Sequence, residues 1–260
     1  MRLFDTHCHL QARRLAALGD AVFDRAAASG VAGFIVMATA PDDWDEVAAL
    51  ADRRAEVVPA FGAHPWYLPA APVQDWLPAL EARLKSRPDA WVGEIGVDRT
   101  AGPPLDLQEA AFAPQLELAG RLGRPASLHC RRTWDRLGWY LARRRHPDVP
   151  VVLHSFGGSV DVARQFLQYN AYFSFSGALT RTRNERLPEV VRFLPRDRVL
   201  IETDSPDLLP QSLWRENPDR PNEPSYLVET LHRLASLWDN PPEETAAVLE
   251  ANTRRLLVRP

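Results

Sequence analysis

Short apolar runs alternate with amphipathic segments along the whole chain. Helical periodicity occupies the intervals between the apolar runs and predicts helices at Asp20–Ser29, Asp43–Arg53, Trp76–Ser86, Asp106–Leu122, Thr133–Arg144, Val160–Gln168, Asn184–Phe193, Tyr226–Trp238 and Pro242–Asn252. The runs themselves predict eight strands, at Arg2–Asp5, Gly33–Ala38, Val57–Phe61, Trp91–Ile95, Ala126–His129, Val151–His154, Tyr172–Ser176 and Val199–Glu202. One strand per roughly 32 residues is the size of a βα unit.

This alternation predicts an α/β fold with parallel strands joined by right-handed crossovers. Eight such units in 260 residues are typical of a closed (β/α)8 TIM barrel. The competing doubly wound sheet is disfavoured because no glycine-rich phosphate loop follows an early strand. We expect a single domain over residues 1–260, whose one long irregular segment is the proline-rich loop Pro206–Pro224.

Composition narrows the functional classes. Charged residues make up 25% of the chain and the net charge is −3, which excludes a protein that holds nucleic acid by bulk positive charge. The longest apolar runs, such as Phe34–Ala38, are too short to cross a bilayer, and the polar N-terminus predicts no signal peptide. Two cysteines, Cys8 and Cys130, are too few for a disulfide framework. We therefore expect a cytoplasmic protein that makes no membrane contact.

Ionisable residues gather where the predicted strands end. Active sites of (β/α)8 barrels lie at the carboxyl ends of the strands. Five of the seven histidines fall at such ends, whereas His146 and His232 fall in helical surroundings. The candidates at these positions are His7, His9, His64, Glu94, His129, His154, Glu202 and Asp204. One histidine on a strand is usually a packed residue, but so many at one end of a barrel predict a metal site.

The number of candidate ligands indicates two ions. Residues i and i+2 of a strand point to the same side, so His7 and His9 can both face the barrel mouth. One tetrahedral ion takes four ligands, and a larger set favours two divalent ions joined by a bridging carboxylate, for which Glu94 is the natural candidate. Imidazole and carboxylate together suit Mg, Mn or Zn. The six expected ligands are His7, His9, Glu94, His129, His154 and Asp204.

The residues around these positions resemble the TatD-like family of metal-dependent deoxyribonucleases and hydrolases. The resemblance covers nearly the whole chain and rests on Asp5–Leu10, Gly62–Pro65, Val92–Asp98, Leu128–Arg131, His154–Gly158, Glu202–Pro206, Arg220–Tyr226 and Ala251–Leu256. It implies an amidohydrolase-like TIM barrel that acts as a divalent-metal DNase. It also implies that one ion is held by His7, His9, Glu94 and Asp204, and the other by Glu94, His129 and His154. Ser155 stands where the family commonly has cysteine, which bears on substrate preference and not on the metal ligands.

Several residues receive expected roles in catalysis. Asp204 and Glu94 are candidate catalytic carboxylates, and Asp204 is the candidate base for the attacking water. His64 lies outside the ligand count and is a candidate donor to a phosphate oxygen or to the leaving group. Arg131 either offers a bidentate fork to phosphate or is an ordinary surface residue at a helix N-terminus. Glu202 has two alternative roles: it either contacts the metal ligands and orients them, or it ends the last strand and pairs with an arginine.

We therefore expect an enzyme that cleaves phosphodiester bonds with a metal-activated water, most specifically a 3'-5' exonuclease on single-stranded DNA. Trp66 and Tyr67 either stack on an exposed base or pack at the rim. Hydrolysis of a small amide, lactone or aminoacyl ester is the alternative. Binuclear amidohydrolases often use a carbamylated lysine as the bridge, however, and the only lysine, Lys85, lies on a predicted helix away from the mouth. A non-enzymatic binding scaffold is the second alternative, disfavoured because this chain keeps all six ligands. The expected partner is DNA or another phosphoester, with no obligate protein partner.

Overall fold

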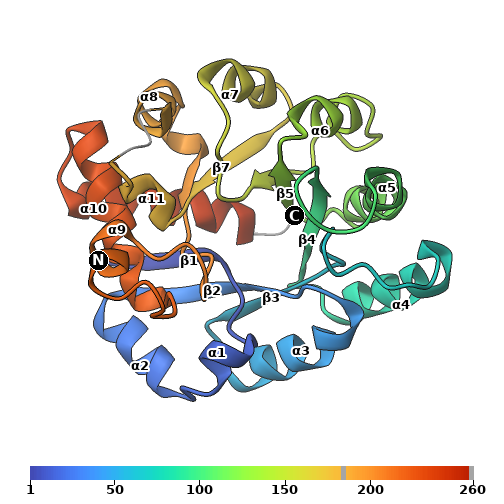
Figure 1. Ribbon diagram of the computed structural model, residues 1–260, viewed down its shortest axis with the longest axis horizontal. Helices are drawn as coiled ribbons and strands as arrows, with labels where there is room; N and C mark the ends of the chain where they lie inside the picture. Colours follow the sequence, from blue (N-terminus) through green and yellow to red (C-terminus); the bar gives the residue numbers. More distant parts are fainter. Residues whose placement is uncertain (183–185, 258–260) are drawn as a thin grey trace. The chain divides into compact units, whose positions relative to one another are not determined.

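The computed structural model describes residues 1–182 and 186–257, in which eight strands alternate with helices (Figure 1). The sheet runs in the order β1-β2-β3-β4-β5-β6-β7-β8, and the pairs along it are parallel. This order confirms the predicted (β/α)8 fold class. The strands are β1 (Leu3–Cys8), β2 (Val31–Met37), β3 (Val57–Phe61), β4 (Trp91–Asp98), β5 (Ala126–Arg131), β6 (Val151–Leu153), β7 (Ala171–Phe175) and β8 (Val199–Ile201).

Each predicted strand is present, but β1, β4 and β5 extend beyond their predicted carboxyl ends. Residues Gly96 to Asp98 of β4 pair with His129 to Arg131 of β5, so the ladder of hydrogen bonds continues where the side chains become polar or small. A Cβ atom at Gly96 would lie 2.0 Å from the carbonyl oxygen of His129, so only glycine permits this approach of the two strands.

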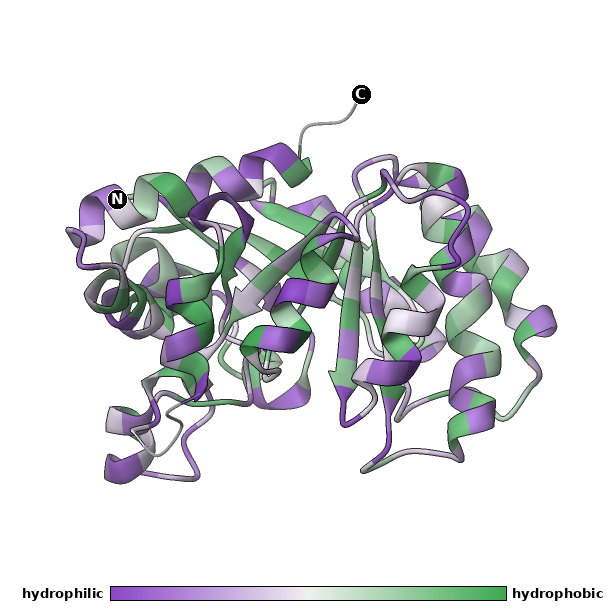
Figure 2. Cartoon of the chain, turned by 90° about the horizontal axis from the view of Figure 1, so that it is seen from above, coloured by the Kyte–Doolittle hydropathy of each residue, from purple (hydrophilic) through white to green (hydrophobic). Residues whose placement is uncertain are grey.

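The predicted helices are also present, with differences at their ends. They are α2 (Ala21–Ala28), α3 (Trp44–Arg53), α4 (Val73–Ser86), α5 (Leu105–Leu122), α6 (Trp134–Leu141), α7 (Val160–Leu167), α8 (Arg186–Phe193), α10 (Leu227–Trp238) and α11 (Pro242–Leu257). The predicted start of α8 at Asn184 lies outside the described residues. Many helices show hydrophilic and hydrophobic bands in alternation (Figure 2). No helix among the described residues is long and apolar enough to cross a membrane.

Among the described residues, two short α-helices were not predicted. The expectation of an irregular loop over Pro206–Pro224 is wrong at α9 (Gln211–Glu216), and α1 (Arg13–Ala16) follows β1. Helix α9 begins after Pro210, whose carbonyl accepts a hydrogen bond from the backbone N–H of Trp214. None of its residues is buried, so it has no apolar periodicity from which it could be recognised.

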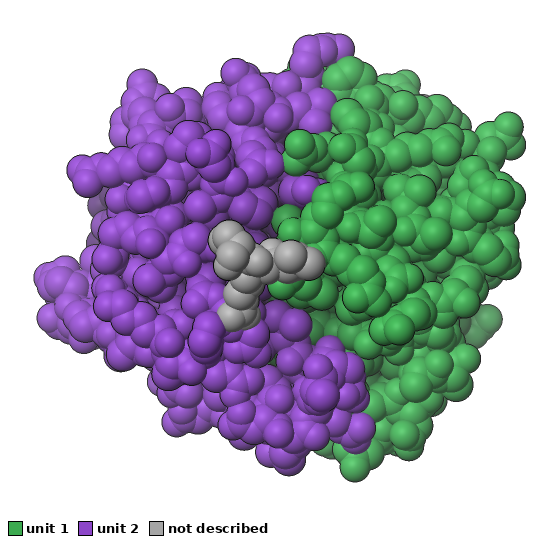
Figure 3. Space-filling model, turned by 180° about the vertical axis from the view of Figure 1, so that it is seen from behind, with its two compact units in different colours: residues 1–36, 155–163, 173–260 green, residues 37–154, 164–172 purple. Residues whose placement is uncertain are grey.

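The chain forms two compact units, one of residues 1–36, 155–163 and 173–260 and the other of residues 37–154 and 164–172 (Figure 3). In the first unit, the Thr6 hydroxyl donates a hydrogen bond to the carbonyl of Ile201 at 2.9 Å and lies 3.1 Å from the hydroxyl of Ser174. These contacts join β1 to β8 and β7. They place the carboxyl end of β1 beside that of β8.

The second unit contains β3 to β6, and its strand β4 is buried throughout. Helix α5 contributes Gln115, which is fully buried and accepts a hydrogen bond from the backbone N–H of Ala63 at 2.8 Å. The amide group of Gln115 also donates to the carbonyl of Ala63 at 3.3 Å. The backbone at the end of β3 is thereby held just before His64.

Candidate metal centre

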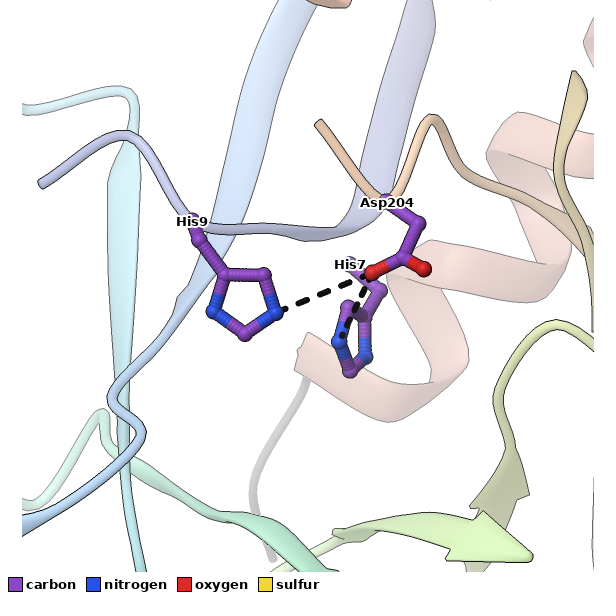
Figure 4. A group of neighbouring side chains, drawn as sticks. All are labelled: His7, His9 and Asp204. Atoms are coloured by element: carbon purple, nitrogen blue, oxygen red, sulfur yellow. Dashed lines mark ion pairs between the residues drawn. The ribbon is translucent and has the colours of Figure 1, made fainter. Parts of the chain in front are cut away.

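The first unit brings together two imidazoles and one carboxylate. Asp204 Oδ1 lies 3.6 Å from His7 Nε2 and 3.7 Å from His9 Nε2 (Figure 4). His7 and His9 share a side because they are two residues apart at the end of β1. Asp204 comes from the segment after β8, and its backbone N–H donates to the carbonyl of His7 at 2.9 Å. One nitrogen or oxygen from each of the three could bind a common cation.

The turn that carries Asp204 is held by Asn222. Asp204 has φ = 56°, a left-handed conformation that aspartate and asparagine adopt more readily than most residues. The Asn222 side-chain amide donates to the carbonyls of Thr203 and Asp207, each at 2.8 Å, and so holds the backbone on both sides of Asp204. Arg25 pairs with the neighbouring Glu223 at 2.7 Å. The Asp204 carboxylate is therefore presented by a braced turn.

Asp5 lies on the same strand, two residues before His7, and is completely buried. Its Oδ1 accepts a hydrogen bond from the backbone N–H of Thr203 at 2.9 Å, and its Oδ2 accepts one from the Thr203 hydroxyl at 2.5 Å. Burial raises the pKa of Asp5 to about 7, although the hydrogen bonds from Thr203 act to lower it. Sequence reasoning gave Asp5 no role, but its i−2 spacing from His7 was a usable signal.

The second unit gathers three imidazoles around one carboxylate oxygen. Glu94 Oε1 lies 2.9 Å from His129 Nδ1 and from His154 Nε2, and 3.3 Å from His64 Nε2. These side chains come from β4 and from the carboxyl ends of β3, β5 and β6, where the sequence placed them. Imidazole nitrogens and a carboxylate that converge at such distances are a donor set that fits a divalent cation of the zinc or manganese type.

His129 makes a second polar contact through its other nitrogen. Its Nε2 lies 2.9 Å from Asp98 Oδ2, and the Asp98 side chain is fully buried. Burial acts to lower the pKa of His129, but the hydrogen bonds with Asp98 and Glu94 outweigh it and raise that pKa. Burial acts to raise the pKa of Asp98, and the hydrogen bonds, first that from His129, bring it below its usual range. Asp98 was not among the predicted site residues, although it follows Glu94 by four positions on one face of β4.

Trp66 packs against two imidazoles of this cluster. The His64 and His129 rings are 4.6 Å apart between centroids, and Trp66 makes edge contacts with both. The Trp66 indole N–H donates to Asp98 Oδ2 at 2.8 Å. Trp66 therefore packs against the two imidazoles while it is only partly buried, and Tyr67 is 54% exposed.

The remaining candidates occupy different settings. Glu202 is fully buried in the first unit, where its Oε1 accepts a hydrogen bond from the backbone N–H of Ser155 at 2.6 Å. Arg131 is exposed as the last residue of β5. Lys85 lies on α4, with its side chain 62% exposed and paired with Glu81 at 2.8 Å. Lys85 is thus paired with a residue of its own helix and does not supply a carbamylated lysine to bridge two metal ions.

The two cysteines are free thiols, in keeping with the expectation of no disulfide framework. Cys8 is fully buried, and its Sγ donates to the carbonyl of Ile35. Cys130 Sγ lies 3.5 Å from the hydroxyl of Thr133. Burial raises the pKa of Cys8 well above its usual value and that of Cys130 to about 12. With pKa values raised in this way, both cysteines are protonated thiols at neutral pH.

Comparison with known proteins shows the family of this chain. The model of the TatD related DNase family matches residues 4–258. The chain belongs to this family. The uncharacterized metal-dependent hydrolase YjjV of Escherichia coli K12 is 34% identical over 98% of this chain and 97% of its own length. The 3'-5' ssDNA/RNA exonuclease TatD of Salmonella typhimurium is 32% identical over 98% of each chain. The crystal structure of the TatD homologue YjjV superposes with a TM-score of 0.90, at 33% identity, over 100% of this chain and 99% of that one. This TatD family member is accordingly a metal-dependent hydrolase.

Proposed function

We propose that this TatD family hydrolase cleaves phosphodiester bonds in single-stranded DNA, acting from the 3' end. The observation that carries the proposal is the pair of imidazole and carboxylate clusters at the strand ends, each suited to a divalent cation. The naming of a relative as a 3'-5' ssDNA/RNA exonuclease, matched along 98% of its length, supports the choice of nucleic acid as substrate.

We assign one divalent cation to each cluster. His7, His9 and Asp204 would hold the first, and Glu94, His129 and His154 would hold the second. The expectation that Glu94 also bridges the two ions stays a prediction, as does the identity of the metal among Mg, Mn and Zn. A site of two ions is the arrangement on which many phosphodiester hydrolases rely.

The reaction breaks the bond between phosphorus and the leaving oxygen as the oxygen of a water molecule attacks the phosphorus. When bound, divalent cations lower the pKa of water and neutralise charge on the phosphate oxygens. Asp204 orients the attacking water and accepts its proton. The Nε2–H of His64 donates a hydrogen bond to a phosphate oxygen or to the leaving oxygen. Arg131, exposed at the end of β5, is assigned to a phosphate on the outer part of the substrate.

The test strips the protein with EDTA, refills it with Mg, Mn, Zn or Co, and offers single-stranded DNA, a short RNA and p-nitrophenyl esters. We expect stepwise shortening of DNA labelled at its 5' end and protection when the 3'-terminal linkages are phosphorothioates. Shortening from the 5' end would refute the assigned polarity. If the protein hydrolyses the p-nitrophenyl esters and cleaves no DNA with any of the four metals, the proposal is refuted in favour of the amide and ester alternative.

A pair of variants tests whether the activity depends on the cluster around Glu94. Glu94→Gln removes the carboxylate charge around which three imidazoles gather, and we expect DNA cleavage to fall by roughly 100-fold or more. Glu56→Gln makes the same chemical change at a residue that pairs with Arg54 at 3.6 Å outside the cluster. Equal activity of the two variants would show that the cleaving activity does not depend on this cluster.

A further inference from the structure

His64 and His129 are two neighbouring imidazoles that distance alone does not distinguish as ligands. His64 Nε2 lies 3.3 Å from His129 Nδ1, and each of these nitrogens faces Glu94 Oε1, at 3.3 Å and 2.9 Å. All three side chains fall into one group whose nitrogens and oxygen could share a cation. The two histidines differ in the hydrogen bond made by the opposite ring nitrogen, which is the nitrogen that does not face Glu94. That bond determines which nitrogen of the neutral ring carries the proton.

The opposite nitrogen of His64 meets a backbone donor. The N–H of Trp66 donates to His64 Nδ1 at 3.1 Å. A backbone N–H can only donate, so Nδ1 must present its lone pair. The proton of the neutral ring therefore sits on Nε2, the nitrogen that points toward Glu94 and His129. In this tautomer, His64 offers an N–H to the cluster and no lone pair for a metal.

The opposite nitrogen of His129 meets an acceptor. Asp98 Oδ2 lies 2.9 Å from His129 Nε2, and a carboxylate at this distance accepts the Nε2 proton. The other contacts of the carboxylate hold it in place: Thr100 donates its backbone N–H and its hydroxyl to Oδ1, each at 2.6 Å, and Trp66 donates its indole N–H to Oδ2 at 2.8 Å. When Glu94 binds a cation, the neutral His129 ring keeps its proton on Nε2, against Asp98, and directs the lone pair of Nδ1 to the side where Glu94 Oε1 lies.

The backbone of Asp98 is held as firmly as its side chain. Its N–H donates to Gln108 Oε1 at 2.7 Å, and its carbonyl accepts from Gln108 Nε2 at 2.9 Å. Asp98 and Gln108 are each 1% exposed. Such a fixed acceptor behind a histidine orients the ring and makes its metal-facing nitrogen more basic.

We propose that Asp98 is a positioning residue that selects His129, and not His64, as the metal ligand of this cluster. Trp66 completes the selection, since its backbone N–H fixes the tautomer of His64 while its indole N–H holds Asp98. Both rings thus carry their proton on Nε2, but they turn different nitrogens toward Glu94: His129 presents the lone pair of Nδ1 as a ligand, and His64 presents the Nε2–H as a hydrogen-bond donor toward substrate. This inference rests on the proposed metal centre and is independent of which phosphoester or other substrate the enzyme cleaves.

The first test measures zinc binding by titration of the EDTA-stripped protein without substrate. In Asp98→Asn the carboxylate is replaced by a neutral amide, which accepts more weakly and can turn its NH2 group toward the ring. We expect one of two zinc ions to bind roughly 10–100-fold more weakly and the other to keep its wild-type affinity. The matched control is Asp135→Asn, an exposed carboxylate that lies 3.7 Å from Arg99, and its zinc affinities should equal those of the wild type. Unchanged zinc affinity in Asp98→Asn would overturn the proposal.

The second test reads the tautomers directly and needs no variant of Asp98. Long-range 1H–15N NMR spectra of the zinc-loaded wild type should show His129 bound through Nδ1 with a proton on Nε2. His64 should show an unprotonated Nδ1, a protonated Nε2 and no bond to zinc. The signals are assigned by loss in His129→Gln and His64→Gln. Zinc on His64, or on Nε2 of His129, would refute the selection. A wild type that binds no zinc would instead refute the metal centre, and a zinc-loaded enzyme inert toward DNA would refute only the substrate.

Discussion

Replacing Asp204 by asparagine separates its charge from its place in the fold. The side chain keeps its size and one oxygen that can face His7 and His9, whose Nε2 atoms lie 3.6 Å and 3.7 Å from Asp204 Oδ1. The left-handed backbone at φ = 56° is one that asparagine adopts readily. The two hydrogen bonds from Asn222 reach the carbonyls of neighbouring residues and are not affected by the change. We therefore expect the variant to fold as the wild type does.

The expected loss lies in the chemical step. An amide cannot accept the proton of the attacking water, and a positioned base is worth roughly 10²–10⁴-fold in kcat. This corresponds to about 3–5 kcal/mol of transition-state stabilisation. KM should change little, because the contacts to phosphate come from groups other than Asp204. A fall in kcat with nearly constant KM is the signature of an interaction made only in the transition state.

The assay is steady-state cleavage of single-stranded DNA with the metal in excess, so that weaker binding of the first ion does not limit the rate. The matched control is Asp207→Asn, which makes the same change three residues later at a side chain that is 75% exposed. Asp207→Asn should keep wild-type kcat. A wild-type kcat in Asp204→Asn would show that the water needs no base and that Asp204 is at most a ligand.

Four further outcomes follow from the sequence and the structure. Metal analysis should find about two divalent ions per chain, with His7→Ala losing mainly one and His129→Ala mainly the other; full retention in both variants would contradict the ligand assignment. The pKa of Asp5 is about 7 in the folded protein and near 3.8 in the unfolded chain, so between these pH values the metal-free native state binds a proton that the unfolded state does not. The free energy of unfolding in urea should therefore fall as the pH rises through this window, and it should fall less steeply in Asp5→Asn. Affinity for single strands should fall only modestly with salt, since the net charge of −3 limits binding to a few local phosphate contacts; a steep slope would count against this. Iodoacetamide at pH 8 should modify neither Cys8 nor Cys130 rapidly in the native protein and both after denaturation, whereas rapid native labelling would contradict the burial of Cys8 or the raised pKa of Cys130.

The strands could be predicted because their signal is local. A run such as Val57–Phe61 contains its own apolar side chains and lies between polar segments, and β3 has the same bounds. Strand β4 shows the limit of this signal, because its last residues are extended only through pairing with β5. Helix α9 shows another limit, since an exposed helix of six residues has no apolar face that periodicity could detect.

The candidate metal ligands could also be predicted from the sequence, for a related reason. The carboxyl ends of parallel strands in a barrel lie at one edge, so a histidine that follows a predicted strand has a predictable location. The i and i+2 spacing of His7 and His9 placed their side chains on one side before any contact was known. Asp98 was not recognised, and Trp66 was expected only to stack or pack, because their importance rests on hydrogen bonds to His129 and His64 that no spacing rule specifies.

The sequence by itself determined the alternation of strands and helices and the strand ends at which the imidazoles and carboxylates lie, because both follow from the order of residues along short stretches of chain. Only the tertiary structure decided which atom of each side chain faces the cluster. Asp98 meets His129 across 31 positions of sequence, and Thr203 meets Asp5 across 198. The proton on an imidazole is placed by its hydrogen-bond partner, and that partner is chosen by folding.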